Sequence, residues 1–417
     1  MKIAVIGAGI IGVTTAFELG RDGHEVTVFE RRGAAAEEAS FANAGIISPG
    51  CITPWVAPGM PAKVLAQLLR RHASVRFALP LGLAEMAWIW RWYRACRPDV
   101  YRNNRARLQA LAFYSRQRLH AISDQLRLAF DRSDGYLVLL RTDRDRALAE
   151  PGLQVLRDAG VKFALIDAEQ VRRLEPGLHP ETRLSAAIQL PEDEVANCRQ
   201  FALLLKHEAQ RLGVRFQFNT VVESLQSAGG MAVALQDASA AQSFDAVVLC
   251  AGVASAALLR PLGLRIPLVA VHGYSISAAI REPLNAPRSA VLDEHYQVAI
   301  ARLGQRVRVA GSAELGGQLA NKRAGSMRTL YKVLQDWFPG AASHAQGVQE
   351  WKGARPMLPD GPPLVGGSGI PGLWLNLGHG CSGWALACGS SRALADMVLG
   401  HAPELDMGGF ALDRLTR

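Results

Sequence analysis

The sequence has little cysteine and no long uninterrupted hydrophobic segment. Its 417 residues include six scattered cysteines, with no Cys-x-x-Cys pair and no secretory leader before the first expected strand. This usage argues against a disulfide scaffold and a zinc site, so we expect reduced thiols, no metal and a cytoplasmic location. The most hydrophobic stretch, residues 77–90, contains Pro80 and Glu85 and is shorter than the roughly 20 residues of a spanning helix. We therefore expect no membrane crossing.

The sequence also has no nucleic-acid recognition motif, although its net charge is positive. The formal net charge is +9, but the basic residues are dispersed, so a nucleic-acid partner is the least favoured explanation. An anionic membrane surface or an anionic substrate stays open, because composition does not locate a patch. With 49% hydrophobic and 20% charged residues, the chain has the balance of a globular protein large enough for two domains.

The chain does contain a strand, helix, strand unit at its start. An apolar strand is expected at residues 2–6, a helix at 11–19 and a second strand at 25–30. Further helices are expected at 61–128 (without any strand), 199–212, 327–337 and 384–399, and further strands at 135–140, 161–166, 214–218, 244–249, 275–277, 296–301, 307–310 and 373–377. These patterns predict an α/β fold, with a Rossmann-like domain and a second α+β domain on a mostly antiparallel sheet.

The loop Gly7-x-Gly9-x-x-Gly12 lies between the first expected strand and helix, which is the context of a dinucleotide fingerprint. Gly7 permits a tight turn, Gly9 lets the backbone approach a pyrophosphate, and Gly12 allows close helix packing. Glu30 ends the second strand, where a carboxylate can accept from ribose hydroxyls. The alternative is a glycine turn with a surface glutamate. NAD and FAD share this loop, but no second fingerprint occurs, so a single bound dinucleotide is expected.

Three later segments carry candidate chemistry. Residues 40–50 are small and polar and can offer N–H groups to a phosphate or a ring, although an ordinary loop has the same composition. Arg355 stands beside the rigid turn of residues 356–361, which suits a fork for a carboxylate, although a surface arginine is the simpler explanation. Residues 376–384 place glycine N–H groups at a helix start, where negative charge on a reduced flavin would be stabilised.

Taken in order, these segments resemble the D-amino-acid dehydrogenases, within the wider family of D-amino-acid, glycine and sarcosine oxidases. The resemblance is carried by Gly7-Ala8-Gly9-Ile10-Ile11-Gly12, Ser40 with Ala42-Asn43-Ala44-Gly45, Trp55-x-Ala57-Pro58-Gly59, Leu190-Pro191-x-Asp193-Glu194, Leu292-Asp293-Glu294-x-Tyr296, Gly353-x-Arg355-Pro356-Met357 and Gly378-His379-Gly380-x-x-Gly383-Trp384, so it runs nearly end to end. Cys381-Ser382 departs from the Thr-Leu expected in the family, which leaves the substrate less certain than the chemistry.

The resemblance implies an FAD domain assembled from separate segments and a substrate domain that covers the flavin. We assign residues 1–55, 192–260 and 350–417 to the FAD-binding domain, and residues 56–191 and 261–349 to the substrate or cap domain. It further implies that Arg355 grips the substrate carboxylate, that residues 378–383 lie against the flavin ring, and that the backbone at Val222 meets adenine. Residues 353–357 contain no cysteine to attach a flavin, so non-covalent FAD is expected.

The candidate cofactor-binding residues are Gly7, Gly9, Ile10, Ile11, Gly12, Glu30, Arg31, Ser40, Asn43, Ala44, Gly45, Ile46, Val222, Ala251, Gly252, Gly378, His379, Gly380, Ser382 and Gly383. The candidate catalytic residues are Arg355, Tyr274, Tyr296 and His379. The two tyrosines are expected on strands of the substrate sheet, where they either hold the carboxylate or amine or pack with a satisfied hydroxyl.

The expected reaction is oxidative deamination of a D-amino acid to a 2-oxo acid and ammonia. Arg355 would orient the Cα hydrogen toward the flavin, and the electrons would pass to a quinone or another acceptor. Residues 63–97, with Arg70, Arg71, Arg76, Arg91 and Arg94 among tryptophans, either rest on anionic lipid at the inner face of the plasma membrane or cap the site. A dehydrogenase for cis-4-hydroxy-D-proline or another cyclic imino acid, and a flavoprotein subunit that needs a partner, are the alternatives.

Overall fold

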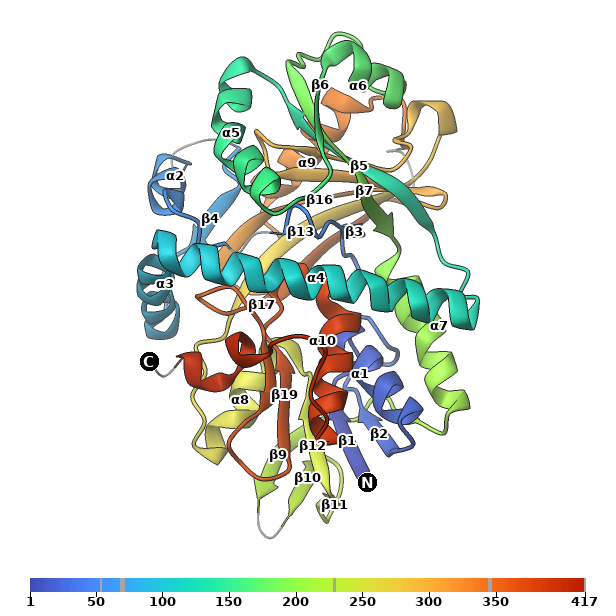
Figure 1. Ribbon diagram of the computed structural model, residues 1–417, viewed down its shortest axis with the longest axis vertical. Helices are drawn as coiled ribbons and strands as arrows, with labels where there is room; N and C mark the ends of the chain where they lie inside the picture. Colours follow the sequence, from blue (N-terminus) through green and yellow to red (C-terminus); the bar gives the residue numbers. More distant parts are fainter. Residues whose placement is uncertain (53–54, 68–71, 228–229, 344–346, 416–417) are drawn as a thin grey trace.

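The computed structural model describes residues 1–417 except 53–54, 68–71, 228–229, 344–346 and 416–417. Figure 1 shows two sheets at opposite ends of the long axis, with the N-terminal unit in the lower part. The long helix α4 (Pro98–Leu126) crosses the middle of the molecule between them. Arg70 and Arg71, which the sequence placed in a basic segment, lie outside the described residues.

The N-terminal unit forms as its hydrophobic pattern predicts. Strand β1 (Lys2–Ile6) pairs in parallel with β2 (Glu25–Phe29), and helix α1 (Ile10–Arg21) connects them. In each strand the four residues after the first are buried, and nearly all of α1 is buried as well. This is the continuous apolar pattern expected of a parallel sheet that is covered on both faces.

The lower sheet has six strands in the order β18-β19-β12-β1-β2-β8, of which only the β18–β19 pair is antiparallel. The added strands are β8 (Arg215–Gln217), β12 (Ala246–Leu249), β18 (Leu364–Gly367) and β19 (Leu373–Leu377). A small three-stranded sheet of β9 (Val222–Ser227), β10 (Met231–Leu235) and β11 (Gln242–Phe244) lies beside it. Segments far apart in the chain therefore build one parallel sheet, and the predicted Rossmann-like α/β fold is confirmed.

The upper sheet has ten strands and is mostly antiparallel, as predicted. Its main path runs β17-β13-β16-β15-β14-β5-β7-β3, with β4 added beside β16 and β6 beside β7. These strands are β3 (Ile46–Ile47), β4 (Val75–Ala78), β5 (Arg132–Leu140), β6 (Ala164–Asp167), β7 (Ala186–Ala196), β13 (Val269–Ala279), β14 (Ala290–Asp293), β15 (Val298–Leu303), β16 (Arg306–Gly316) and β17 (Gln349–Met357). Only the β14–β5 and β16–β4 pairs are parallel.

The remaining helices cover these sheets. They are α2 (Met60–Gln67), α3 (Leu83–Ala95), α5 (Asp143–Asp158), α6 (Ala168–Leu174), α7 (Cys198–Arg211), α8 (Ser255–Leu259), α9 (Ala324–Trp337) and α10 (Gly383–Val398). Among the described residues, no helix combines the length and hydropathy that a membrane crossing requires.

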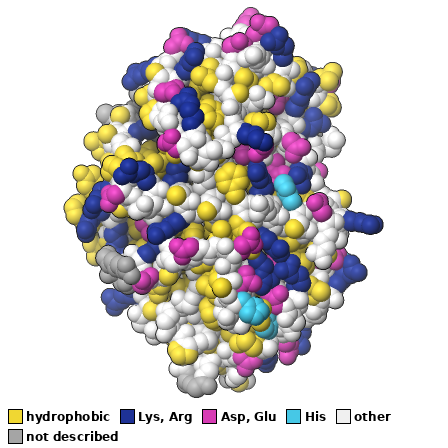
Figure 2. All heavy atoms as spheres, in the orientation of Figure 1, with side chains coloured by type: hydrophobic (Ala, Val, Ile, Leu, Met, Phe, Trp, Pro, Cys, Tyr) yellow, Lys and Arg dark blue, Asp and Glu magenta, His cyan; other side chains and the backbone are white. Residues whose placement is uncertain are grey.

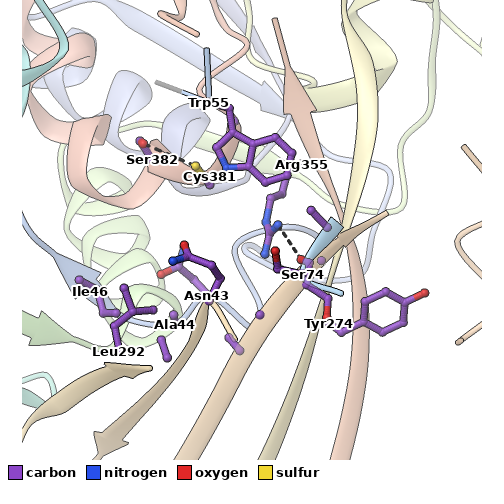
Figure 3. A pocket seen from close by; sticks show the side chains of 18 of the residues that line it. Asn43, Ala44, Ile46, Trp55, Ser74, Tyr274, Leu292, Arg355, Cys381 and Ser382 are labelled. Atoms are coloured by element: carbon purple, nitrogen blue, oxygen red, sulfur yellow. Dashed lines mark hydrogen bonds between the residues drawn. The ribbon is translucent and has the colours of Figure 1, made fainter. Parts of the chain in front are cut away.

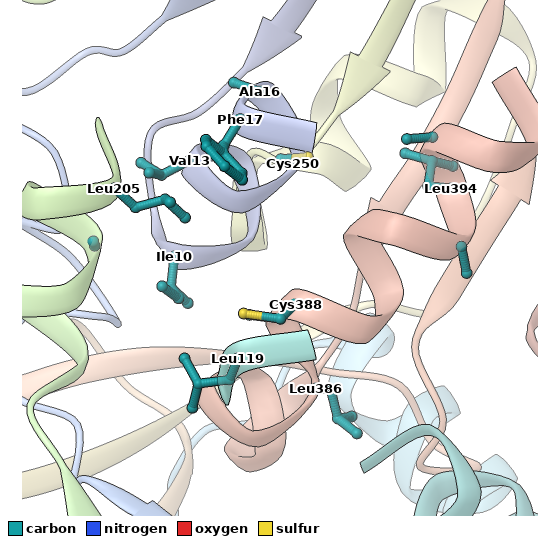
Figure 4. Close-up of a cluster of buried hydrophobic side chains, with 14 of the residues drawn as sticks. Ile10, Val13, Ala16, Phe17, Leu119, Leu205, Cys250, Leu386, Cys388 and Leu394 are labelled. Atoms are coloured by element: carbon teal, nitrogen blue, oxygen red, sulfur yellow. The ribbon is translucent and has the colours of Figure 1, made fainter. Parts of the chain in front are cut away.

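The largest core lies where α1, α4, α7 and α10 meet. Figure 4 shows Val13 and Phe17 of α1 near Leu205 of α7, with Leu119 of α4 near Cys388 of α10. The approach of α4 to α10 is close, because a Cβ at Gly389 would lie 2.9 Å from Ser115 atoms. This packing joins α1, which follows the glycine loop of residues 7–9, to α10, which follows the glycine loop of residues 378–382.

The structure differs from the expected elements at several places, and it contains elements that were not expected, such as α5 and β7. Residues 75–78 form β4 inside the region predicted to be purely helical. Tyr296 lies in the turn before β15 instead of on a strand. The end of β7 and all but the first residue of β17 fall within residues 192–260 and 350–417, assigned to the FAD-binding domain, yet both strands belong to the ten-stranded sheet.

Candidate active site

The three glycines of the N-terminal loop are required for different reasons. Gly7 has φ +101°, and a Cβ there would lie 2.7 Å from the Cys250 carbonyl oxygen. A Cβ at Gly12 would lie 1.8 Å from the Gly7 carbonyl oxygen. At Gly9 the nearest atom is Ser40 Oγ at 3.5 Å, which is an ordinary contact. The protein's own packing explains the first and third glycines, whereas the space around Gly9 leaves room for a ligand close to the backbone.

The residues predicted for the adenosine half of the cofactor lie around this loop. Glu30 accepts hydrogen bonds from the N–H groups of Ala8 at 2.7 Å and Arg32 at 2.8 Å, so its carboxylate is fixed beside the loop. The N–H of Thr220 donates to the Glu30 carbonyl at 2.9 Å, which brings the start of β9, with Val222, to the same place. Arg31 is held by Glu38 and is half exposed.

Ser40 lies at the N-terminus of α1, as expected for a residue near the pyrophosphate. The Ile10 N–H donates to Ser40 Oγ at 3.0 Å, so the serine oxygen stands at the start of the helix. Gly9 gives no side-chain cap, and the first-turn N–H groups of Ile11 and Gly12 carry the positive end of the helix dipole. Ala251 and Gly252 follow Cys250, whose carbonyl abuts Gly7. These features fit a phosphate group.

A cavity of about 490 Å³ lies against the ten-stranded sheet and contains part of the predicted site. Its lining includes the predicted residues Asn43, Ala44, Ile46, Tyr274, Arg355, Gly380 and Ser382, which come from segments up to hundreds of residues apart. Figure 3 shows Asn43, Ala44 and Ile46 on one side of it and Arg355 and Ser382 on another. Tyr296, His379, Gly45 and Gly383 do not line this cavity.

Arg355 is a cation without a matching carboxylate. It lies on β17, and its Nη1 donates to the Ser312 carbonyl at 3.1 Å (Figure 3). Among the described residues no carboxylate is within ion-pair distance of it. Burial lowers the pKa of its guanidinium, although an arginine stays protonated at physiological pH. A largely desolvated cation that faces a cavity attracts an anion, so this end of the cavity suits a carboxylate ligand.

Gly273 allows Arg355 to take this position, and the sequence analysis missed it. Gly273 pairs with Gly353 across the β13–β17 ladder, and Gly353 lies two residues from Arg355 on the same face. A Cβ at Gly273 would lie 2.3 Å from Arg355 Nη2 and 2.4 Å from its Cζ. The guanidinium therefore lies directly over the Gly273 backbone. A glycine inside a strand is the available signal, because it often marks a close approach.

The loop of residues 378–383 packs against the strand that carries Arg355. Gly380 has φ +57°, and a Cβ there would lie 2.6 Å from Met357 Sδ. His379 forms a bridge with Met357 and its Nε2 lies 3.0 Å from Ser390 Oγ. Because the Ser390 hydroxyl donates to the Ala387 carbonyl, we assign the histidine proton to Nε2.

This assignment leaves His379 Nδ1 as a buried acceptor. It has no hydrogen-bond partner among the described residues, and burial lowers the pKa of His379 to about 3. The imidazole is therefore neutral at ordinary pH. A buried orphan acceptor beside a glycine-rich loop fits a bound cofactor that brings donors and acceptors of its own. The residues present thus fit a flavin dinucleotide at both ends of the site.

The two tyrosines are not equivalent. Tyr274 is among the residues that line the cavity, but its hydroxyl donates to Glu314 Oε2 at 2.7 Å and accepts from the Arg323 N–H at 3.3 Å. Its ring points away from Asn43 and Ala44 in Figure 3. Tyr296 packs outside the cavity, with the Arg141 guanidinium 5.0 Å from its ring. The packing alternative therefore describes both side chains better than a role in holding substrate.

Further side chains that the sequence analysis did not assign line the cavity. Ser48 donates to Asp193, whose pKa is raised to about 6 by burial. Glu294 lines the same cavity, and burial raises its pKa. Cys51 and Cys381 also line it, although burial raises the pKa of Cys51 to about 12 and keeps that thiol protonated. Ser48, Cys51, Glu294 and Cys381 come from distant segments, so the sequence alone did not indicate that they line one cavity.

The fold is that of a dinucleotide-dependent oxidoreductase, and its cavity is lined by an arginine that has no ion-pair partner among the described residues. The profile described as FAD dependent oxidoreductase matches residues 2–397, so the chain belongs to that family. A D-amino acid dehydrogenase of Cereibacter sphaeroides is 43% identical over 99% of this chain and 95% of its own. Another, of Rhizobium rhizogenes, is 37% identical over 99% of this chain and 100% of its own. These relatives confirm the resemblance and the expected enzyme class, an FAD-dependent amino-acid dehydrogenase.

Solved structures show the same fold at low sequence identity. Glycine oxidase from Geobacillus kaustophilus superposes with a TM-score of 0.78 at 21% identity, over 98% of this chain and 97% of its own. L-proline dehydrogenase from P. horikoshii gives a TM-score of 0.74 at 17% identity, over 100% and 98%. An L-α-glycerophosphate oxidase from Mycoplasma pneumoniae with FAD bound gives 0.70 at 17% identity, over 95% and 94%.

Proposed function

We propose that the protein oxidises D-amino acids to 2-oxo acids and ammonia with non-covalently bound FAD. The observation that carries this proposal is the uncompensated Arg355 guanidinium in a cavity that the glycine loop of residues 378–383 also borders. An α-carboxylate supplies the missing negative charge. The relatives named D-amino acid dehydrogenases match this chain over 95–100% of their own length, which supports D-amino acids as the substrates.

In this mechanism the chain acts mainly by positioning. Arg355 binds the α-carboxylate, and Gly273 and the Ser312 carbonyl fix the guanidinium that does so. The bound flavin supplies a hydride acceptor for the Cα hydrogen. The Tyr274 hydroxyl is engaged by Glu314 and is not assigned as a base. If the amine binds unprotonated, hydride transfer requires no side-chain base. A fixed near-attack geometry of this kind contributes roughly 7–11 kcal/mol. Water then hydrolyses the released imino acid.

Anaerobic mixing of the flavin-loaded protein with D- and L-amino acids tests this function. We expect D-amino acids to bleach the flavin absorbance and their L-enantiomers to leave it unchanged. Bleaching by D-proline analogues alone would favour the cyclic imino-acid alternative, and a yellow protein that no amino acid bleaches would favour a partner-dependent subunit. Acid precipitation that leaves flavin on the protein would contradict non-covalent binding.

We further propose that electrons pass to a quinone at an anionic membrane surface, which α3 contacts. The outer face of α3 carries Leu83 (82% exposed), Met86 (49%), Trp90 (61%) and Tyr93 (57%), spaced as one helical stripe. Arg91 and Arg94 are exposed beside the stripe. Figure 2 shows hydrophobic and basic side chains together along the left edge, where Figure 1 places α2 and α3. This combination is typical of helices that lie in a lipid interface.

Flotation with anionic vesicles tests the membrane contact. We expect the protein to float with phosphatidylglycerol vesicles and the Trp90→Ser/Tyr93→Ser variant to lose most of this binding, because two interfacial aromatic side chains are removed. Leu148→Ser is the matched control, since Leu148 is 70% exposed on α5. Equal flotation of all three proteins would contradict the assignment to α3.

A further inference from the structure

A second pocket adjoins the active-site cavity and has an entirely hydrophobic lining. It is lined by Trp55, Met60, Val64, Val75, Phe77, Trp88, Ile89, Trp92, Val271, Ala313 and Leu315. Trp55, Met60, Val64, Val75 and Ala313 also line the cavity that contains Arg355, so the two spaces share a wall. A ligand in this pocket would therefore lie next to the redox site without passing Arg355.

Two of the three tryptophans that line this pocket, Trp88 and Trp92, have indole N–H groups that already donate hydrogen bonds. Trp88 Nε1 donates to the Met357 carbonyl at 3.1 Å, and Trp92 Nε1 donates to the Trp55 carbonyl at 2.8 Å. Each indole therefore presents only its ring to the pocket. Such a space rejects charged or strongly hydrated molecules, because they would lose water without gaining a hydrogen bond.

Helix α3 forms one side of this pocket and also carries the exposed hydrophobic stripe. Trp88, Ile89 and Trp92 line the pocket, whereas Trp90 and Tyr93 lie on the outer face with their rings stacked 6.1 Å apart. One helix thus separates the outer hydrophobic surface from an inner hydrophobic space, with the active-site cavity beyond it. This arrangement places the hydrophobic pocket one helix away from the surface that we propose contacts the membrane, which suits a lipid-soluble ligand.

We propose that this pocket, which we call the α3 pocket, is the binding site of a quinone electron acceptor. The inference rests on the proposed function, because it places the flavin ring in the adjoining cavity. In the overall reaction two electrons and two protons leave the amino acid and convert the quinone to its quinol, while the amino acid becomes an imino acid. The curated relatives are named dehydrogenases, which fits an acceptor other than oxygen.

The open space in the α3 pocket is about 30 Å³, so a quinone ring enters only when lining side chains move. Met60 is suited to such movement because its unbranched thioether chain adapts to irregular spaces. Met60 lies on the short helix α2 and is partly exposed, with Leu65 of the same helix 73% exposed. The α2 side of the pocket is therefore less constrained than the sheet side, where Val271 and Leu315 are buried.

Ile89 provides a variant that changes the α3 pocket alone. It lines this pocket but not the active-site cavity, so Ile89→Phe narrows the pocket and Ile89→Ala widens it. Ile280→Phe is the matched control, because Ile280 is also partly buried but packs against a different hydrophobic cluster. Retained flavin and an unchanged melting temperature identify the variants that fold normally.

The first measurement is reoxidation of the dithionite-reduced protein, which does not depend on any amino acid. We expect Ile89→Phe to slow reoxidation by decylubiquinone at least tenfold and to leave reoxidation by the water-soluble acceptor ferricyanide unchanged. Ile89→Ala and Ile280→Phe should keep the quinone rate within about threefold of the original. Equal slowing of both acceptors, or no slowing by Ile89→Phe, would overturn the proposal.

The second measurement is photolabelling with an azidoquinone, followed by peptide mapping. We expect label on residues 55–64 and 83–95, and competition by decylubiquinone. Label confined to other segments would overturn the assignment even if the reoxidation rates agreed with it. If D-amino acids fail to bleach the flavin while label and quinone reoxidation appear as expected, the proposed substrate is wrong and the acceptor site stands.

Discussion

Lys352 and Arg355 lie three residues apart on β17, yet only Lys352 has a carboxylate partner among the described residues. Lys352 is almost fully buried, and its Nζ donates to Glu314 at 2.9 Å and to the carbonyls of Gln318 and Asn321 at 2.8 Å each. All three donors of the ammonium group are used. Arg355 donates to a single carbonyl and has no carboxylate partner among the described residues.

The difference separates a cation whose partners are supplied by the fold from one that we propose binds a ligand. Residues three apart on a strand point to opposite faces, so the two charges meet different surroundings. Hydrogen bonds from Lys352 and Tyr274 lower the pKa of Glu314 despite its burial, whereas burial dominates at Arg355 and lowers the pKa of its guanidinium. A partly buried charge that the fold leaves without an ion-pair partner favours the binding of an anion, which supports the proposed role of Arg355.

The largest expected effect comes from breaking the compensated pair. Lys352→Met leaves the buried Glu314 carboxylate with the partly exposed Arg323 guanidinium, 3.0 Å away, as its cationic partner, so we expect the free energy of unfolding to fall by about 3 kcal/mol, the lower end of the range for a broken buried pair. Urea denaturation followed by circular dichroism measures this. Adding Glu314→Gln to Lys352→Met should restore part of the loss, because no charge then remains buried and unpaired. A Lys352→Met protein of unchanged stability would contradict the structural role.

A third buried base, His379, sharpens the comparison because the fold suppresses its charge. Its pKa is lowered to about 3 by burial, whereas the unfolded value is near 6.5. Between these values only the unfolded chain binds the proton. The contribution of His379 to stability is therefore complete above about pH 6.5 and is lost by about 1.4 kcal/mol per pH unit as pH falls toward 3.

Denaturation curves at several pH values compare the original protein with His379→Gln. We expect the variant to show a slope of stability against pH that is smaller by this amount between pH 6 and 4.5. Parallel slopes for the two proteins would mean that His379 takes up a proton in the folded state.

A smaller effect is expected when Arg355 is displaced but kept. Gly273→Ala places a Cβ where the guanidinium lies, so we expect KM for the amino acid to rise about tenfold, equivalent to about 1.4 kcal/mol, with flavin content unchanged. Ser326→Ala on α9 is the control, because Ser326 does not line the cavity and its Oγ has no hydrogen-bond partner among the described residues. An unchanged KM in Gly273→Ala would show that Arg355 does not bind substrate from this position.

The smallest expected effect is on stability when Arg355 itself is removed. Because Arg355 makes one hydrogen bond and no ion pair in the described structure, Arg355→Leu should change the free energy of unfolding by less than about 1 kcal/mol. Thermal unfolding of the flavin-free protein measures this without the ligand. If Arg355→Leu lowered the free energy of unfolding as much as Lys352→Met, Arg355 would be a structural cation like Lys352.

Local patterns predicted the elements whose neighbours are close in the sequence. The expected strands at residues 2–6 and 373–377 coincide with β1 and β19, because continuous apolar runs end at glycines there. Strand β4 was missed because its four residues pair with β16, more than two hundred residues away, and carry no alternation of their own. Tyr296 was placed on a strand because the turn before β15 contains no glycine or proline.

Candidate site residues could be predicted where they belong to a sequence motif. They could not be predicted where their importance comes from a contact between distant segments. Arg355 and the glycines of residues 378–383 were assigned from sequence, and the structure brings both to one region. Gly273 was not assigned, because its importance arises from a guanidinium eighty-two residues later on the neighbouring strand. The hydroxyl bond from Tyr274 to Glu314 likewise depends on the pairing of β13 with β16.

The most direct test of the account is anaerobic flavin reduction by D-alanine and by ethylamine, the amine that lacks its carboxylate. The original protein and an Arg328→Leu control, altered at an exposed arginine of α9, should both prefer D-alanine strongly. Arg355→Leu should lose about 2–5 kcal/mol of this preference, roughly 30- to 5,000-fold, because one partner of a buried charge pair is gone. An Arg355→Leu protein that keeps the full preference for D-alanine would contradict the claim that Arg355 is the carboxylate-binding cation.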